Sequence, residues 1–110
     1  MTGEYDLAIS DFGKSLALDP KLALTYQNRG VSLGRLGRYS EALDDFNKAI
    51  ALDSTDARTY FNKAAVCAKI GRFKDAIESY KAFLVHAQAG DIRLEIAKQQ
   101  IEQLRRYVPE

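Results

Sequence analysis

The sequence predicts an all-α protein built as a solenoid of antiparallel helix hairpins. Three observations carry this prediction: small and aromatic residues recur every 34 residues, each interval holds two amphipathic stretches with helical spacing, and glycine separates the two stretches. Only two prolines interrupt the 110 residues. A unit of this size can bury its apolar face only against its neighbours, so we expect the hairpins to stack.

The repeat becomes visible when the sequence is shifted by 34 residues against itself. Six positions of one unit are matched in the next: Tyr26, Gly30, Gly37, Ala42, Phe46 and Ala49 against Tyr60, Ala64, Gly71, Ala76, Tyr80 and Phe83. A shift in the other direction places Gly3, Ala8 and Phe12 on the second half of a unit. We therefore expect one domain that consists of a half repeat (1–22), two whole repeats (23–56 and 57–90) and a C-terminal capping helix (91–110).

The first expected helix runs from Glu4 to Leu18 and is the second helix of a truncated repeat. Its apolar side carries Ala8, Ile9, Phe12 and Leu16. The helix that precedes it in a whole repeat is missing, so part of this side is predicted to lie uncovered, as interaction surfaces often do. Gly13 in its middle costs about 1 kcal/mol relative to alanine. Asp19 and Pro20 are typical of an N-cap and a first helical residue, and predict that the next helix starts there.

Within the whole repeats, glycine and residue spacing define each hairpin. Gly37 is expected to end the first helix of its repeat in the left-handed conformation. The following helix has an apolar face that contains Ala42 and Phe46, and we expect its polar residues Glu41, Asp44, Asp45 and Lys48 to lie on the opposite, solvated face. The small residues Gly30, Ala42, Ala64 and Ala76 are predicted where two helices cross closely.

The last expected helix follows Asp91, which can cap it, and resembles the first helix of a further repeat. Lys98 stands where Gly30 and Ala64 stand in the whole repeats. A further helix could not pack closely against a lysine there, so we expect stacking to stop at this helix. Its solvated face is predicted to consist of Lys98, Gln99, Glu102, Arg105 and Arg106.

Composition argues against several classes of function. Hydrophobic residues make up 46% and charged residues 28%, and the formal net charge of +1 provides no bulk attraction for nucleic acid or an anionic membrane. No apolar run approaches the roughly 20 residues of a membrane span, and no basic leader opens the sequence, so the cytoplasm is the default expectation. Because Cys67 and His86 are single, we expect no disulfide, metal, cofactor or catalytic group, and therefore no enzyme.

Two sets of motifs carry a family resemblance: Tyr26-x-x-Arg29-Gly30 with Ala42-x-x-x-Phe46, and Tyr60-x-x-Lys63-Ala64 with Ala76-x-x-x-Tyr80. With these motifs, the sequence resembles the tetratricopeptide repeat (TPR) family over about residues 3–90. The resemblance implies a right-handed superhelix, either as a bacterial-type TPR domain or as a fragment of a larger TPR protein. It departs from the family where tyrosine replaces tryptophan and where Arg29 and Lys63 replace leucine.

The resemblance also implies a function, which is binding of a peptide or helical segment of a partner protein in a concave groove lined by the first helices. These helices carry arginine and lysine but no acid, so we expect a partner with acidic and apolar groups. The family's inward positions correspond to Leu24, Gln27, Asn28, Val31, Arg35, Arg58, Phe61, Asn62, Ala65, Lys69, Ile92 and Ile96. The carboxylate clamp of co-chaperone repeats is incomplete here, so no receptor for chaperone tails is predicted.

A second interpretation treats the chain as a self-associating structural scaffold. The uncovered side of the first helix could then join copies of the chain through Ile9, Phe12 and Leu16, as filaments or exchanged hairpins. The sequence leaves this alternative open beside peptide binding.

Overall fold

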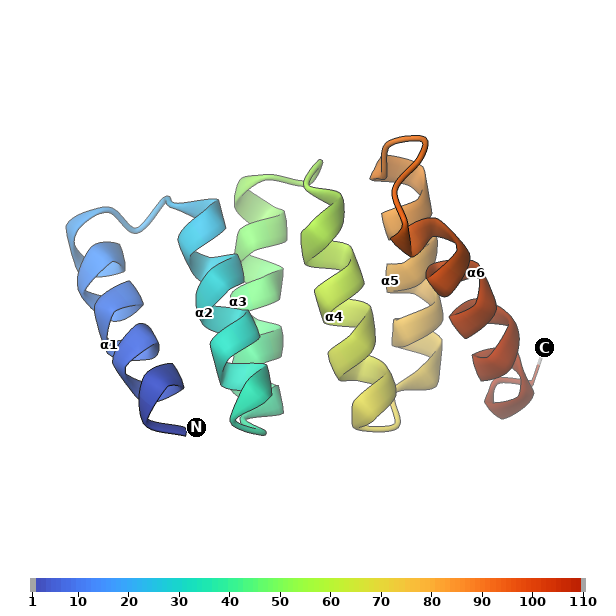
Figure 1. Cartoon of the computed structure of the whole chain (residues 1–110), viewed down its shortest axis with the longest axis horizontal. Helices are drawn as coiled ribbons and strands as arrows, with labels where there is room; N and C mark the ends of the chain where they lie inside the picture. Colours follow the sequence, from blue (N-terminus) through green and yellow to red (C-terminus); the bar gives the residue numbers. More distant parts are fainter. Residues whose placement is uncertain (1, 110) are drawn as a thin grey trace. The chain divides into compact units, whose positions relative to one another are not determined.

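The computed structural model describes residues 2–109, which form α-helices, a short 3-10 helix and no β-strand. The elements are α1 (Thr2–Leu18), α2 (Ala23–Arg35), α3 (Tyr39–Leu52), α4 (Ala57–Lys69), α5 (Phe73–His86), α6 (Arg93–Leu104) and η1 (Arg105–Tyr107) (Figure 1). They form two compact units that divide between Ser54 and Thr55. The all-α prediction is confirmed.

The first unit contains the hairpin of α2 and α3, with α1 packed against α2. The hairpin turns at Gly37, whose φ of 78° is the predicted left-handed conformation, and the Arg38 N–H donates to the Leu33 carbonyl at 2.9 Å. Gly30 faces the ring of Phe46, and a Cβ at Gly30 would lie only 2.7 Å from a ring atom. The predicted close crossing of small residue and aromatic ring is therefore confirmed.

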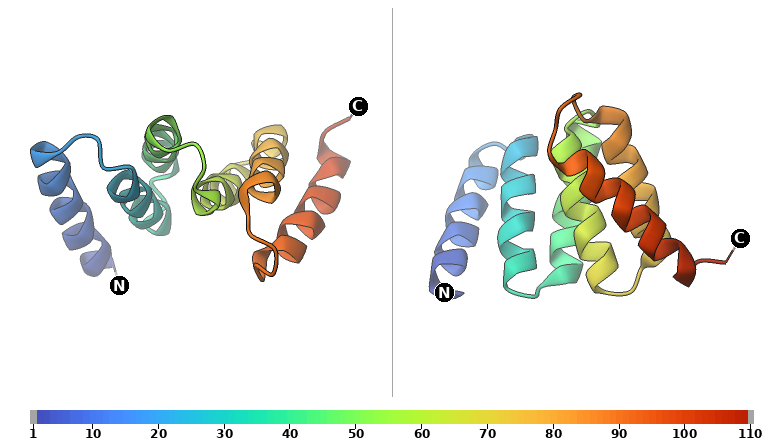
Figure 2. Two further views of the ribbon diagram at one scale, coloured as in Figure 1. Left: turned by 90° about the horizontal axis from the view of Figure 1, so that it is seen from above. Right: turned by 45° about the vertical axis from the view of Figure 1, so that its right-hand side comes forward.

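The second unit repeats this hairpin with α4 and α5 and adds α6. Gly71 has a φ of 82°, and the Arg72 N–H donates to the Cys67 carbonyl at 2.8 Å. Five hydrophobic residues in the interior of this unit are fully buried: Ala64, Cys67, Ala76, Phe83 and Ala97. α6 packs against α5 and crosses the hairpin at an angle (Figure 2). The residues expected on the solvated face of this last helix are all exposed.

Helix starts differ from the prediction by two residues at α1, which begins at Thr2, by one at α6, where Ile92 rather than Asp91 is the N-cap, and most at α2. Asp19 and Pro20 precede α2 by a turn, in which the Asp19 carboxylate accepts the Lys21 N–H at 3.0 Å, and the helix begins only at Ala23. A short aspartate side chain can bond the backbone two residues on, which favours a turn as strongly as a cap. By contrast, Asp56 caps α4 by accepting the Arg58 N–H.

The prediction that Asp45 lies on a solvated face is wrong. Its side chain is only 6% exposed and forms a bidentate ion pair with Arg29 of α2, with distances of 2.7 Å to Nε and 2.8 Å to Nη2. The pair joins α2 to α3 across the hairpin. Asp45 neighbours Phe46 along the helix, so it turns toward α2 rather than toward solvent.

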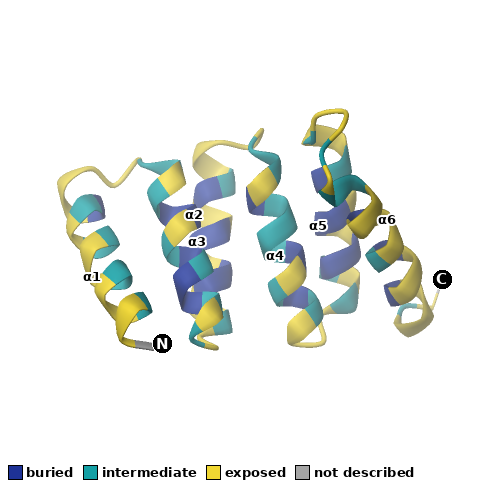
Figure 3. Ribbon diagram, in the orientation of Figure 1, coloured by how far each residue is buried: buried dark blue, intermediate teal, exposed yellow. Residues whose placement is uncertain are grey.

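Most of α1 is exposed or half-buried, as the colouring in Figure 3 shows. Ile9 and Phe12 are half-buried, but Leu16 is buried in a cluster with Tyr26 and Ala49. Leu16 therefore belongs to the core of its own unit and cannot serve as an interface residue, contrary to the expectation. The apolar side chains that do protrude from α1 are Leu7, 69% exposed, and Leu18, 90% exposed.

Candidate functional site

One side of the second unit collects the predicted site residues of α4 and α6. On α4 the spacing of three and four residues places Arg58, Phe61, Asn62, Ala65 and Lys69 along one side of the helix. Arg58, Ala65 and Lys69 are exposed, whereas Phe61 and Asn62 are half-buried. At the other helix, Ile92 is 87% and Ile96 46% exposed. We call these seven residues, together with Arg93, the α4–α6 surface.

Phe61 forms the floor of this surface because it extends from α4 and contacts both α5 and α6. Its ring meets Tyr80 and Phe83 of α5 edge-on, with centroids 5.6 and 5.1 Å apart. The guanidinium of Arg93 lies 5.5 Å from the Phe61 centroid and 5.2 Å from that of Phe83. Such cation–π contacts fix the N-terminal end of α6 over the hairpin. The sequence prediction missed Arg93.

Two arginines beside this floor are held by the same arrangement. In each case the arginine donates three hydrogen bonds to an aspartate two residues earlier. Its backbone N–H and its Nε donate to Oδ1 of the aspartate, and its Nη2 donates to Oδ2. The pairs are Asp56 with Arg58 and Asp91 with Arg93. The recurring Asp-x-Arg at a helix start was the signal that could have revealed both pairs from the sequence.

These ion pairs alter the electrostatics that the sequence suggested. Hydrogen bonds from Arg93 lower the pKa of Asp91 from 3.8 to about 2, and those from Arg58 lower the pKa of Asp56. The same bonds raise the pKa of both arginines. Each arginine charge is thus positioned and balanced by a carboxylate. Lys69, which forms no ion pair with any described residue, is the unbalanced cation of α4 on this surface.

A cleft of about 530 Å³ opens next to the two pairs in the same unit. Asp56, Arg58, His86, Asp91 and Arg93 are among the residues that line it. The His86 ring stacks on Tyr60 with centroids 5.2 Å apart and planes 9° from parallel. The cleft is therefore polar and charged, and apolar anchoring is available on the α4–α6 surface beside it rather than inside it.

In the first unit, the predicted residues all lie on α2, but not all reach the surface. Leu24, Asn28 and Arg35 are exposed, and Val31 is half-buried. Gln27 is only 4% exposed, so its expected role as a lining residue does not match the structure. Arg29, counted among the cations of this helix, is likewise engaged with Asp45 inside the hairpin.

Groups for catalysis or metal binding are sparse in the part of the chain that the structure describes. Among residues 2–109, no cluster of three or more His, Cys, Asp or Glu side chains could hold a metal ion. Cys67 is fully buried, and burial raises the pKa of its thiol, which disfavours the reactive thiolate. None of the described helices is long and apolar enough to cross a bilayer.

Helix hairpins that recur at 34 residues, the first with Gly30 packed on the ring of Phe46, define a helical-repeat protein. The tetratricopeptide repeat family matches the sequence twice, over residues 23–56 and 46–78. The chain belongs to the tetratricopeptide repeat family.

Solved structures agree with this assignment at the level of the fold. The TPR domain of Arabidopsis OM64 is 21% identical, with a TM-score of 0.84 over 96% of this chain and 84% of that one. The TPR2B domain of yeast Sti1, in complex with an Hsp70 peptide, is 22% identical, with a TM-score of 0.85 over 96% and 86%. The chaperone SycD of Yersinia enterocolitica, with a peptide of YopD, is 16% identical, with a TM-score of 0.87 over 97% and 84%. No curated protein sequence matches the chain.

Proposed function

We propose that this chain is a protein-interaction module whose α4–α6 surface binds a peptide or helical segment of a partner protein. The carrying observation is that Ile92 and Ile96, one helical turn apart, protrude into solvent on either side of Arg93, whose guanidinium lies over the aromatic floor at Phe61. Isolated exposed apolar residues are ordinary, but two on one helix face beside a half-buried ring form a patch that suits apolar anchors.

Charge around this patch favours a partner segment that also carries a carboxylate. Lys69 has no acidic partner among the described residues, and the aspartates that hold Arg58 and Arg93 in place bond Nε and Nη2 but not Nη1 of each guanidinium. A prepositioned arginine loses less side-chain entropy when it binds than a free one. The peptides in the structures of the similar Sti1 and SycD domains support a peptide as the ligand, without identifying one for this chain.

A peptide array tests the proposal. Peptides that combine aliphatic or aromatic residues with aspartate or glutamate should bind, whereas their lysine-substituted versions should not. Ile92→Asp with Ile96→Asp should abolish binding while far-UV circular dichroism stays unchanged. The control is Val85→Asp, since Val85 is 77% exposed on α5 outside the α4–α6 surface and its substitution should leave binding intact. Binding that survives the double substitution would place the ligand elsewhere.

A further inference from the structure

α1 carries an exposed stripe that its own unit does not use. Glu4, Leu7, Asp11, Lys14 and Leu18 follow one another at intervals of three and four residues, and all five are exposed. The opposite side of the helix supplies Leu16 to the core with Tyr26. The N-terminal half of this stripe therefore presents an apolar side chain between two carboxylates. We call Glu4, Leu7 and Asp11 the α1 stripe.

The other repeats form the equivalent helix without an apolar side chain between two acids. The residues that occupy the place of Leu7 in α3 and α5 are Glu41 and Asp75, and each forms an ion pair with the arginine three residues before it. In α1 the arginine is replaced by Glu4 and the acid by Leu7. At equivalent positions, α3 and α5 thus present an arginine paired with an acid, whereas α1 presents an acid and a protruding leucine.

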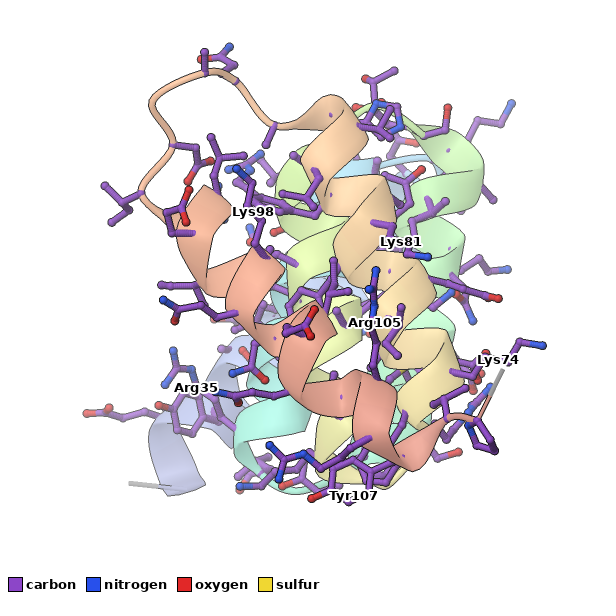
Figure 4. The ribbon with its side chains drawn as sticks, turned by 90° about the vertical axis from the view of Figure 1, so that its right-hand side faces the viewer. Arg35, Lys74, Lys81, Lys98, Arg105 and Tyr107 are labelled. Atoms are coloured by element: carbon purple, nitrogen blue, oxygen red, sulfur yellow. The ribbon has the colours of Figure 1, made fainter. Side chains whose placement is uncertain are left out.

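The second unit contains a groove with the complementary pattern. It encloses about 340 Å³ beside α5, with Ile77 and Val108 as apolar lining and Lys74, Lys81 and Arg105 as cations. Figure 4 shows Arg105 and Lys81 extending along the same side of α5, with Lys74 further along that helix. Glu78 is the one acid that lines the groove. We call this site the α5 groove.

The cations of the α5 groove are little used within the chain. Lys74 and Lys81 form no ion pair with any residue that the structure describes, and Arg105 is 3.7 Å from Glu102 with both side chains exposed. The corresponding places in α3 hold Ser40 and Asn47. Since the same hairpin forms there without lysine, the folded state does not explain why positive charge is concentrated on α5.

We propose that the α1 stripe of one copy docks in the α5 groove of a second copy. Leu7 enters the groove over Ile77, and the carboxylates that flank it meet Lys74 and Lys81. The register fits because the acid–leucine–acid residues of α1 and the lysine–isoleucine–lysine residues of α5 share the spacing of three and then four. Two helices that pack side by side bring such positions opposite each other.

The geometry also argues against another mode of self-association, in which α1 of one copy completes a hairpin with α6 of another. Lys98 of α6 stands at the place of Gly30, where even one Cβ would approach the Phe46 ring to 2.7 Å. A lysine there prevents Phe12 from packing as Phe46 does. Docking in the α5 groove needs no such approach.

The proposed contact is heterologous, because the two surfaces belong to different parts of the chain. Copies would therefore add head to tail, in open rows or closed rings. A single stripe in a small, charged-rimmed groove makes a weak interface, so association is expected at concentrations on the order of 0.1–1 mM. Its charged contacts are solvent-exposed and should weaken as salt rises.

Sedimentation equilibrium at low salt tests the proposal with a charge-swap design. The wild type should gain mass with concentration above the 12.3 kDa of one chain. Glu4→Lys with Asp11→Lys should weaken association at least tenfold, and so should Lys74→Glu with Lys81→Glu. An equimolar mixture of these two variants should recover it, because each altered surface finds its complement. Lys21→Glu with Lys48→Glu, which changes the net charge at exposed positions elsewhere by as much as Lys74→Glu with Lys81→Glu does, should behave as wild type.

Circular dichroism of each variant confirms that helix content is retained before masses are compared. A wild type that remains monomeric at about 1 mM would overturn the proposal. So would association that persists in either double variant, or a mixture that fails to recover it while both variants stay folded. None of these outcomes depends on peptide binding at the α4–α6 surface, since no residue of that surface is altered.

Discussion

Removal of Arg29 should expose how much the first hairpin depends on its internal ion pair. Arg29→Met keeps the aliphatic length of the side chain but leaves the Asp45 carboxylate, 6% exposed, without its two guanidinium donors. Removal of one partner of a fully buried pair costs about 3–5 kcal/mol. Arg29 is 27% exposed and two clefts reach Asp45, so water relieves part of the loss. We expect a cost of about 2–3 kcal/mol in the free energy of unfolding.

Urea unfolding followed by far-UV circular dichroism measures this cost, and the repeat supplies the controls. Lys63 stands at the place of Arg29 in the second unit, and Ser79 stands there at the place of Asp45, so Lys63→Met should change stability by less than about 0.5 kcal/mol. The double variant Arg29→Met with Asp45→Ser copies the polar group of the second unit and should recover to within about 1 kcal/mol of wild type.

Two results would refute the reasoning on the ion pair. A loss below about 0.5 kcal/mol in Arg29→Met would mean that the Asp45 carboxylate is solvated in the folded state. A double variant as unstable as the single one would mean that Arg29 acts through its packing rather than through the charge of Asp45.

Two further predictions concern glycine and pH. Gly30→Ala should lower the free energy of unfolding by about 1–2 kcal/mol, because its Cβ would press on Phe46, whereas Gly13→Ala, with nothing within 4 Å, should raise it by about 1 kcal/mol in the same urea titration. Asp91, with a pKa of about 2 against 3.8 when unfolded, binds fewer protons in the folded state, so its stabilisation is full above pH 4 and lost as pH falls toward 2. The stability difference between wild type and Asp91→Asn should shrink over that range, and a constant difference would contradict the pairing with Arg93.

Local chemistry made much of the fold predictable. Gly37 and Gly71 adopt positive φ as a helix-ending glycine does, because residues with a Cβ are strained there. The crossing of Gly30 with Phe46 follows from the small-x-x-x-aromatic pattern, since only a residue of minimal size allows that ring to approach the backbone. These features depend on contacts within one hairpin, which the 34-residue period places in register.

The site was less predictable, and Asp45 and Gln27 show why. Asp45 was assigned to a solvated face from helical phase, and Gln27 to the groove from the inward positions of the family, yet both are buried. Helical phase locates a side chain only to within about one neighbouring position. Asp45 lies at the border between the two faces of α3, and its carboxylate turns inward because the guanidinium of Arg29 on α2 donates two hydrogen bonds to it. Arg93 was missed for a related reason, since its role comes from rings on α4 and α5.

The amino-acid pattern alone determined the all-α class, the hairpin turns and the small residues at helix crossings, because these depend on backbone conformation and on neighbours close in the chain. Only the tertiary structure decided that Asp45 neutralises Arg29 across the hairpin. The pairs of Asp56 with Arg58 and of Asp91 with Arg93 join residues two apart and had a signal in the sequence. An ion pair between two helices depends on the positions of its atoms to within an ångström, which residue spacing cannot specify. The cations without an acidic partner, including Lys69, Lys74 and Lys81, are the ones available to bind a partner.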